Sequence, residues 1–300
     1  MFKQQNSTKI VVIKNYKMNK YLIILLVFVL PGYNPIKPNK KNIACCGSTA
    51  INDFARLGSI PDFVRSHPNP RPLKGKVFEG MDIHFPGTDG KEAHGYEFQT
   101  KKQSNKFLFV IHDYFGLGDY AKTESEKFFH DLKDVNVIAL DLYDNKSTLN
   151  RDTAAKYMQQ VTQDRAFAII NGAIKMVGEK AKIGTIGWCF GGGWSLQTAI
   201  AAGAHTEACV VYYGMPEKDI NKLKSLHSDV LGIFADKDKW INKDVVAGFQ
   251  KNMEAAGKTL TIKHYDADHG FGNPTTAQHD GVAAADAYKN AITYLKSRLG

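Results

Sequence analysis

The chain has 300 residues, of which 43% are hydrophobic, and a formal net charge of +9. This length and hydrophobic content fit one sizeable globular domain with an appendage. The charge lies at one end: residues 1–44 hold eight lysines and no acidic side chain, and the rest of the chain carries 31 basic and 30 acidic side chains. The body is therefore close to neutral. It has no basic stretch interleaved with aromatic residues, so we expect no nucleic-acid partner.

Residues 1–44 form a basic leader with an uninterrupted apolar run, Tyr21 to Leu30. Ten residues are too few to cross a bilayer comfortably, but they fit the apolar region of a signal peptide. Met18, just before the run, is an alternative start. The leader predicts an exported, periplasmic or membrane-tethered protein, with membrane association only through residues 21–30. If the segment is an irrelevant extension, the protein is cytoplasmic.

The four cysteines are Cys45, Cys46, Cys189 and Cys209. Four are too few for a disulfide framework, and adjacent cysteines rarely bridge each other. No spacing of cysteine and histidine matches a zinc site. We therefore expect neither a metal nor an organic cofactor. A reactive thiol favours a reducing compartment, which conflicts with export.

Residues 45–75 read as an N-terminal arm with two short helical segments near 52–57 and 61–65, followed by proline-rich extended chain. Residues 76–300 alternate apolar strands with helical patterns, which predicts an α/β fold with a mainly parallel sheet and helices on both faces. We expect strands at 77–85, 93–99, 107–111, 135–140, 182–187, 207–213, 230–235 and 260–265. We expect helices near 120–133, 153–180 (one or two), 194–200, 243–256 and 276–299.

The segment Gly187-Trp188-Cys189-Phe190-Gly191-Gly192 lies between a predicted strand and a predicted helix. Its pattern, G-x-C-x-G-G, is that of a nucleophile elbow with cysteine in place of serine. The sharp turn requires glycine two residues either side of the nucleophile. It also places the sulfur at a helix N-terminus, which favours a thiolate and a developing oxyanion. The alternative is a buried cysteine in a glycine-rich turn.

A cysteine nucleophile needs a base, and the base needs a partner that orients it. Asp238 follows the predicted strand 230–235, and His269 follows the strand 260–265. The order Cys189, Asp238, His269 is that of α/β-hydrolases. We interpret Asp236, Asp266 and Asp268 as exposed or turn-forming, His112, His264 and His279 as structural, and Ser195 as a packing residue.

Five segments together resemble the dienelactone hydrolase family of α/β-hydrolases: Ile111-His112-Asp113-Tyr114-Phe115-Gly116-Leu117, Ala139-Leu140-Asp141-Leu142-Tyr143, the elbow, Phe234-Ala235-Asp236-Lys237-Asp238 and His269-Gly270-Phe271. The resemblance covers about residues 76–300. It implies an α/β-hydrolase fold, Cys189 as nucleophile, His269 as base and Asp238 as its partner. It also implies an oxyanion hole formed by the backbone N–H groups of Phe190 and Tyr114.

Two departures from the family pattern bear on the substrate. Asp113 stands where the family has a glutamate that helps to generate the thiolate. The family's arginine after the histidine is absent, and Arg151 is our candidate for the other arginine of the carboxylate clamp. A missing bidentate contact changes substrate preference. Trp188 and Trp240 are candidates for lining an apolar pocket, together with the rings of Phe190 and Tyr114.

The sequence thus predicts a cysteine-dependent hydrolase of lactones or small carboxylic esters that acts as a monomer. One alternative is a broad esterase or thioesterase with the same triad. The other is a non-catalytic binding protein that keeps the elbow for packing.

Overall fold

The computed structural model describes residues 50–73 and 75–300. Our predictions for the leader, including the signal peptide, Met18 and the pair Cys45 and Cys46, lie outside these residues. Within the described ranges, no helix is both long enough and apolar enough to cross a membrane.

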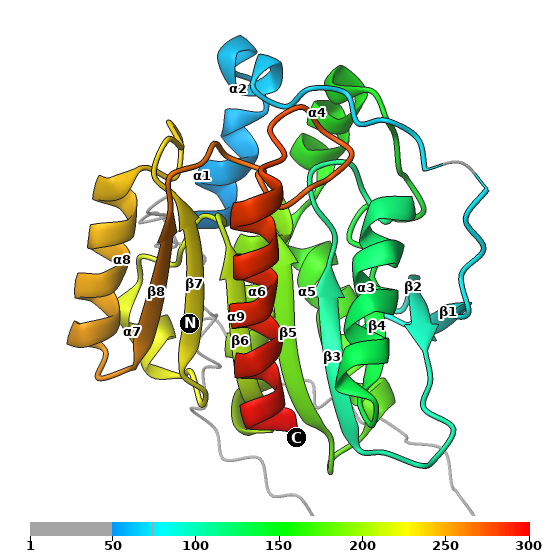
Figure 1. Ribbon diagram of the computed structural model, residues 1–300. Helices are drawn as coiled ribbons and strands as arrows, with labels where there is room; N and C mark the ends of the chain where they lie inside the picture. The colour runs from blue at the N-terminus through cyan, green and yellow to red at the C-terminus, as the bar shows by residue number, and fades with distance from the viewer. Residues whose placement is uncertain (1–49, 74) are drawn as a thin grey trace, which may run out of the picture. The chain divides into compact units, whose positions relative to one another are not determined.

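The core of the domain is an eight-stranded sheet with the strand order β1-β2-β4-β3-β5-β6-β7-β8 (Figure 1). β1 pairs with β2, and β2 with β4, in antiparallel fashion, and all other pairs are parallel. The predicted mainly parallel sheet is therefore confirmed. The strands are β1 (Met81–Pro86), β2 (Glu92–Phe98), β3 (Lys106–Ile111), β4 (Asn136–Leu140), β5 (Lys182–Trp188), β6 (Thr206–Tyr212), β7 (Val230–Ala235) and β8 (Leu260–Tyr265).

Helices cover both faces of this sheet, which is why β4 and β7 consist entirely of buried residues. α3 and α9 lie on one face, and α5 and α6 lie on the other (Figure 1). Two neighbouring residues of β5 face these two helix layers. A side chain at Gly184 would meet Leu299 of α9, whereas the Thr185 hydroxyl donates to the Ser195 carbonyl of α6. The helices that follow the arm are α3 (Asp119–Leu132), α4 (Arg151–Gln160), α5 (Gln163–Val177), α6 (Phe190–Ala202), α7 (Ile220–Lys224), α8 (Lys243–Ala255) and α9 (Gly281–Leu299).

The N-terminal arm contributes two short helices, α1 (Ala50–Leu57) and α2 (Pro61–Arg65), as predicted. α2 lies over the end of the sheet where the parallel strands finish (Figure 1). Phe54 and Phe63 are buried and meet edge to face, with ring centroids 5.6 Å apart. The extended chain after α2 is thereby held next to the loops at the carboxyl ends of the strands, where open α/β sheets carry their sites.

Local capping sets where two helices begin in regions that the sequence predicted as helical. The region 153–180 forms two helices because Thr162 starts the second one, its side chain accepting the N–H of Arg165. The last helix begins at Gly281 rather than near 276, because Asp280 accepts the N–H groups of Val282 and Ala283. Residues 266–280 therefore form a long loop above the sheet. The first strand begins at Met81 rather than Val77, and α7 was not predicted.

Candidate active site

Cys189 forms the turn between β5 and α6, with φ 56° and ψ −115°. A non-glycine residue in this region carries strain of about 1–3 kcal/mol, so the surrounding structure must hold it in place. The Cys189 N–H donates to the carbonyl of Tyr212, and the Cys189 carbonyl accepts from Gly192 and Gly193. The predicted strand–turn–helix geometry of the elbow is present.

Close backbone approach explains the glycines of the elbow. A Cβ on Gly187 would lie 2.1 Å from the Gly191 carbonyl oxygen, and a Cβ on Gly191 would lie 2.3 Å from the carbonyl oxygens of Ile111 and His112. No side chain fits either position, because real Cβ atoms do not approach backbone this closely. The elbow thus brings the end of β5 against the end of β3.

Asp238 and His269 meet above the sheet, although they come from loops after different strands. Oδ2 of Asp238 lies 2.5 Å from Nδ1 of His269, and Oδ1 of Asp238 accepts the N–H groups of Trp240 and Ile241. Burial opposes the charge of Asp238, but the imidazole of His269 and these N–H groups outweigh it and lower the pKa of the carboxyl. An ionised carboxylate can only accept, so Nδ1 of His269 carries a proton.

The other ring nitrogen of His269 faces the cysteine. Because Asp238 holds Nδ1, Nε2 is the nitrogen left to face the sulfur. It is buried and has no hydrogen-bond partner among the described residues, and a ring nitrogen of His269 lies within 4.8 Å of Sγ of Cys189. Burial opposes the charge of the ring, but the Asp238 carboxylate, with the nearby Cys189 sulfur, raises the pKa of His269 well above its ordinary value. A buried polar atom without a partner is uncommon in a folded protein and calls for an explanation, which a catalytic role would supply here.

His67, from the N-terminal arm, lies on another side of the same sulfur, and sequence reasoning missed it. Its Nε2 lies 3.6 Å from Sγ of Cys189, and its Nδ1 donates to the carbonyl of Phe63 at 2.7 Å. The ring stacks on Tyr114, with centroids 4.5 Å apart. Burial, followed by the charge of His269, lowers the pKa of His67 to about 3. Nothing in the pattern of residues 45–75 marks this histidine, because its contact with the thiol spans 122 positions.

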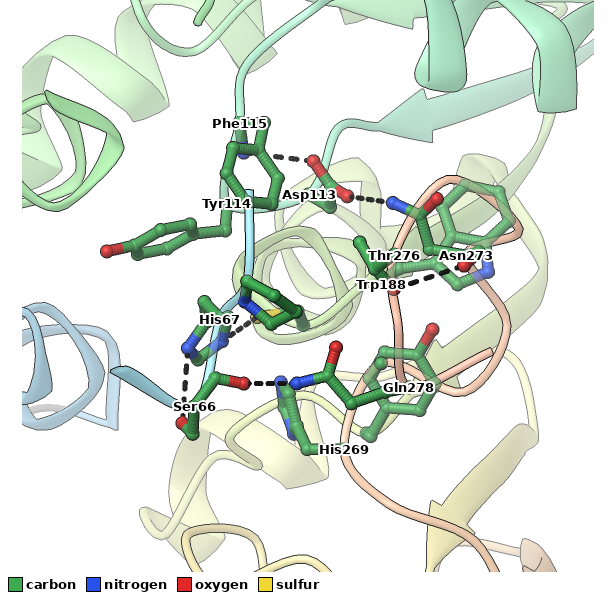
Figure 2. A pocket seen from close by; sticks show the side chains of 14 residues that line it. Ser66, His67, Asp113, Tyr114, Phe115, Trp188, His269, Asn273, Thr276 and Gln278 are labelled. Carbon is green, nitrogen blue, oxygen red and sulfur yellow. Dashed lines mark hydrogen bonds between the residues drawn. The ribbon is translucent and has the colours of Figure 1, made fainter. Parts of the chain in front are cut away.

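Cys189, His67 and His269 line a cavity of about 30 Å³ (Figure 2). His67 and Ser66 enter it from the arm and lie opposite the loop that carries Gln278, whose amide donates to the Ser66 carbonyl. The remaining lining residues are Pro68, Asp113, Tyr114, Phe115, Trp188, Cys189, Tyr213, His269, Gly270, Asn273 and Thr276. The long loop 266–280 supplies several of them. The arm and this loop therefore close the cavity over the thiol.

Asp113 lines this cavity with a fixed carboxylate. Oδ1 accepts the N–H of Phe115, and Oδ2 accepts the side-chain amide of Asn273 (Figure 2). Burial raises the pKa of Asp113 to about 6, against the opposing effect of these two donors. Asn273, which the sequence analysis did not single out, thus sets the orientation of Asp113.

The other predicted site residues lie around the cavity in different ways. Trp188 and Tyr114 line it, whereas the ring of Phe190 stacks on buried His112. Phe190 is the first residue of α6, so its N–H has no acceptor within the helix. Trp240 packs on the arm, where its Nε1 donates to the hydroxyl of Ser66.

Arg151 lies at the start of α4, and its side chain is not among the groups lining the cavity. Its N–H donates to the side chain of Asn69, and its carbonyl accepts the hydroxyl of Tyr114. Its role as a carboxylate clamp stays a prediction.

Two groups of side chains within the described ranges have donor atoms close enough to hold a metal ion. His67, Cys189 and His269 form a buried group at the elbow. Exposed His84 and Glu92 form the other group with half-buried His94, on the hairpin of β1 and β2.

Comparison with known proteins gives a consistent result. The model of the dienelactone hydrolase family matches residues 94–299. The protein called usf from Aquifex pyrophilus is 26% identical over 222 residues, covering 70% of this chain and 96% of its own length. A carboxymethylenebutenolidase candidate from Aquifex aeolicus is 24% identical over 223 residues, with the same coverage. The crystal structure of a dienelactone hydrolase-like promiscuous phosphotriesterase from metagenomic libraries has a TM-score of 0.62 at 20% identity, covering 74% of this chain and 99% of that chain.

Proposed function

Because the chain belongs to the dienelactone hydrolase family and is a carboxylic ester hydrolase, we propose that it hydrolyses lactones or small esters through a triad of Cys189, His269 and Asp238. The observation that carries this proposal is the position of His269. Its Nδ1 is bound to Asp238, its buried Nε2 has no partner among the described residues, and the ring lies with a nitrogen within 4.8 Å of the thiol sulfur.

In the first half of the reaction, Nε2 of His269 takes the thiol proton and Sγ of Cys189 bonds to the substrate carbonyl carbon. The charge on the carbonyl oxygen is held by the N–H groups of Phe190 and Tyr114. When the carbon–oxygen single bond breaks, the leaving alkoxide takes the proton from His269. A thioester on Cys189 remains, and with a lactone the new hydroxyl stays attached to the acyl group.

In the second half, a water molecule donates a proton to His269 and its oxygen bonds to the thioester carbon. The carbon–sulfur bond breaks, the carboxylic acid leaves, and His269 returns the proton to sulfur. Asp238 supports both halves, because an ionised carboxylate next to Nδ1 stabilises the imidazolium formed each time.

The walls of the cavity bear on the substrate class. Trp188, Tyr114 and Tyr213 supply an apolar surface that fits a small acyl group, and Asp113 is an acidic group among them. We assign Asp113 to thiol activation. Arg151 would bind a substrate carboxylate, so Arg151→Gln should raise KM for a lactone that carries a carboxylate and leave KM for a neutral ester unchanged.

The test is hydrolysis of the cis and trans dienelactones and of p-nitrophenyl acetate by the wild type, Cys189→Ala and the matched control Cys209→Ala. Cys209 is also buried and free, and burial raises the pKa of its thiol to about 12, which makes it a poor nucleophile. We expect turnover by the wild type and by Cys209→Ala, and none by Cys189→Ala. Activity that survives the loss of Cys189 would contradict the proposal, and a wild type without turnover would favour a binding protein.

A further inference from the structure

Three side chains that can bind a metal, Cys189, His67 and His269, lie close together at the elbow. We propose that Sγ of Cys189 and Nε2 of His67 and His269 bind a divalent transition metal, Zn²⁺ above all, and that the bound metal blocks hydrolysis through the thiol. The proposal concerns metal binding and does not require that the substrate assignment be right.

The spacing of the donor atoms fits zinc. Zn²⁺ takes sulfur at about 2.3 Å and imidazole nitrogen at about 2.0–2.1 Å in tetrahedral geometry, which places sulfur and nitrogen about 3.6 Å apart. Sγ of Cys189 and Nε2 of His67 are 3.6 Å apart, and the three donor atoms all lie within 4.8 Å of one another. Only a small movement of His269 is then needed to complete three bonds to one ion.

Both histidines are held with the correct nitrogen free. Nδ1 of His67 donates to the carbonyl of Phe63, and Nδ1 of His269 donates to Asp238. Metal-binding histidines use such a second partner to fix the tautomer and orient the ring. Each Nε2 is therefore the ring nitrogen left to bind a metal beside the sulfur. That of His269, which has no hydrogen-bond partner among the described residues, gives up its proton when the metal binds.

The surroundings suit a cation. The thiolate and the carboxylate of Asp238 offset the charge of a divalent ion, and Asp113 lines the same cavity. Thiolate and imidazole together are ligands that zinc and copper prefer, whereas magnesium and calcium prefer oxygen. The cavity lies beside the three ligands and leaves room for a fourth ligand such as water.

Metal binding and thiol chemistry exclude each other at this site. A metal bond to Sγ occupies the electron pair that would attack the substrate. A bond to Nε2 of His269 occupies the position that accepts the thiol proton. Zn²⁺ should therefore inhibit ester hydrolysis reversibly, and a chelator should restore the activity.

The direct test is titration of the full chain with Co²⁺, followed by displacement with Zn²⁺, in absorbance. The background carries His84→Gln, which disables the other candidate group on the hairpin. We expect one equivalent of Co²⁺ with a thiolate-to-cobalt charge-transfer band in the near ultraviolet. Cys189→Ser should remove that band. His67→Gln should weaken binding by more than about 100-fold, since loss of an outer partner of a ligand already costs about 10–100-fold.

These outcomes decide whether the metal binds at this site, without reference to turnover. Absence of the charge-transfer band, or equal Co²⁺ affinity in His67→Gln and the background, would overturn it. If His67→Gln loses its near-ultraviolet circular dichroism and so its packing, the Cys189→Ser variant decides: an unchanged band there would mean that the metal is bound elsewhere. Inactivity of the enzyme would leave the absorbance result intact, so the two proposals fail separately.

Discussion

Oδ2 of Asp238 lies 2.5 Å from Nδ1 of His269, and the two side chains come from loops that follow neighbouring parallel strands, β7 and β8. The contact joins residues 31 positions apart and fixes which nitrogen of the imidazole carries a proton. The acceptor that faces the thiol therefore depends on the carboxylate.

Asp238→Asn should reduce kcat/KM by about 10²–10⁴-fold, the range that general acid–base catalysis contributes. An asparagine still accepts the N–H groups of Trp240 and Ile241, but its amide donates to Nδ1 and forces the proton onto Nε2, which then cannot accept the thiol proton. Steady-state kinetics on p-nitrophenyl acetate measures this.

The matched control is Asp236→Asn in the same loop, where the carboxylate pairs with half-exposed His264. Asp236→Asn should change kcat/KM by no more than about twofold, because ordinary surface substitutions have small effects. Equal losses in the two variants would argue that the loop, and not the triad, is being disturbed.

The glycines of the elbow give a stability prediction. Gly191→Ala should lower the free energy of unfolding by about 3 kcal/mol or more, because the new Cβ would lie 2.3 Å from two carbonyl oxygens. Gly248→Ala, in α8, meets no atom within 4 Å and should raise it by about 1 kcal/mol. Urea unfolding measures both. Similar midpoints for the two variants would contradict the close approach of β3 and the elbow.

His67 should make the fold sensitive to acid. Its pKa falls from an ordinary 6.5 to about 3 in the folded chain, so between these values the unfolded chain binds the extra proton. Stability should then fall as the pH drops below 6.5, by up to about 1.4 kcal/mol per pH unit. His269 adds no slope there: its pKa is raised, so it is protonated in both states below 6.5, and its contribution is lost only as the pH rises towards its folded pKa.

Asp113 partly offsets the loss of stability that His67 causes at low pH. Its pKa rises from 3.8 to about 6, so in that window the folded chain binds more protons and stability rises as the pH falls. The pH dependences that His67 and Asp113 give to the free energy of unfolding oppose each other. Only the difference in this free energy between the wild type and His67→Gln isolates the contribution of the histidine. That difference should shrink as the pH falls from 6.5 to 4.5. A difference independent of pH would mean that His67 is protonated in the folded chain.

Asp113 itself should shape the pH–rate profile. If its carboxylate helps to generate the thiolate, kcat/KM of the wild type should fall as the pH drops through about 6, where Asp113 takes up a proton. Asp113→Asn should have a lower plateau and lack this transition. Persistence of the transition in the variant would assign it to another group.

Much of the site follows from local pattern. The elbow is recognisable because Gly187, Cys189 and Gly191 satisfy a backbone requirement within five residues, and Asp238 and His269 stand directly after apolar runs that read as strands. Parallel strands bring such loops to one edge of a sheet, so their meeting is predictable.

The contribution of the arm does not follow from local pattern. His67 reaches the thiol only because Phe63 packs against Phe54, Tyr114 and Trp240, contacts that depend on the completed fold. Asn273 lies between the predicted strand 260–265 and the predicted helix 276–299, and no periodic pattern there indicates where its side chain points. Both residues act through tertiary contacts without a periodic signal.

The measurement that tests the triad most directly is the mass of the acyl-enzyme. Wild type and Cys189→Ala are mixed with p-nitrophenyl acetate, quenched in acid within the first turnover, and analysed by intact mass and peptide mapping. The account predicts one acetyl group on the peptide that contains Cys189, in amounts equal to the initial burst of nitrophenol, and none in the variant. Steady turnover with no acyl group on Cys189, or an equal burst from Cys189→Ala, would contradict it.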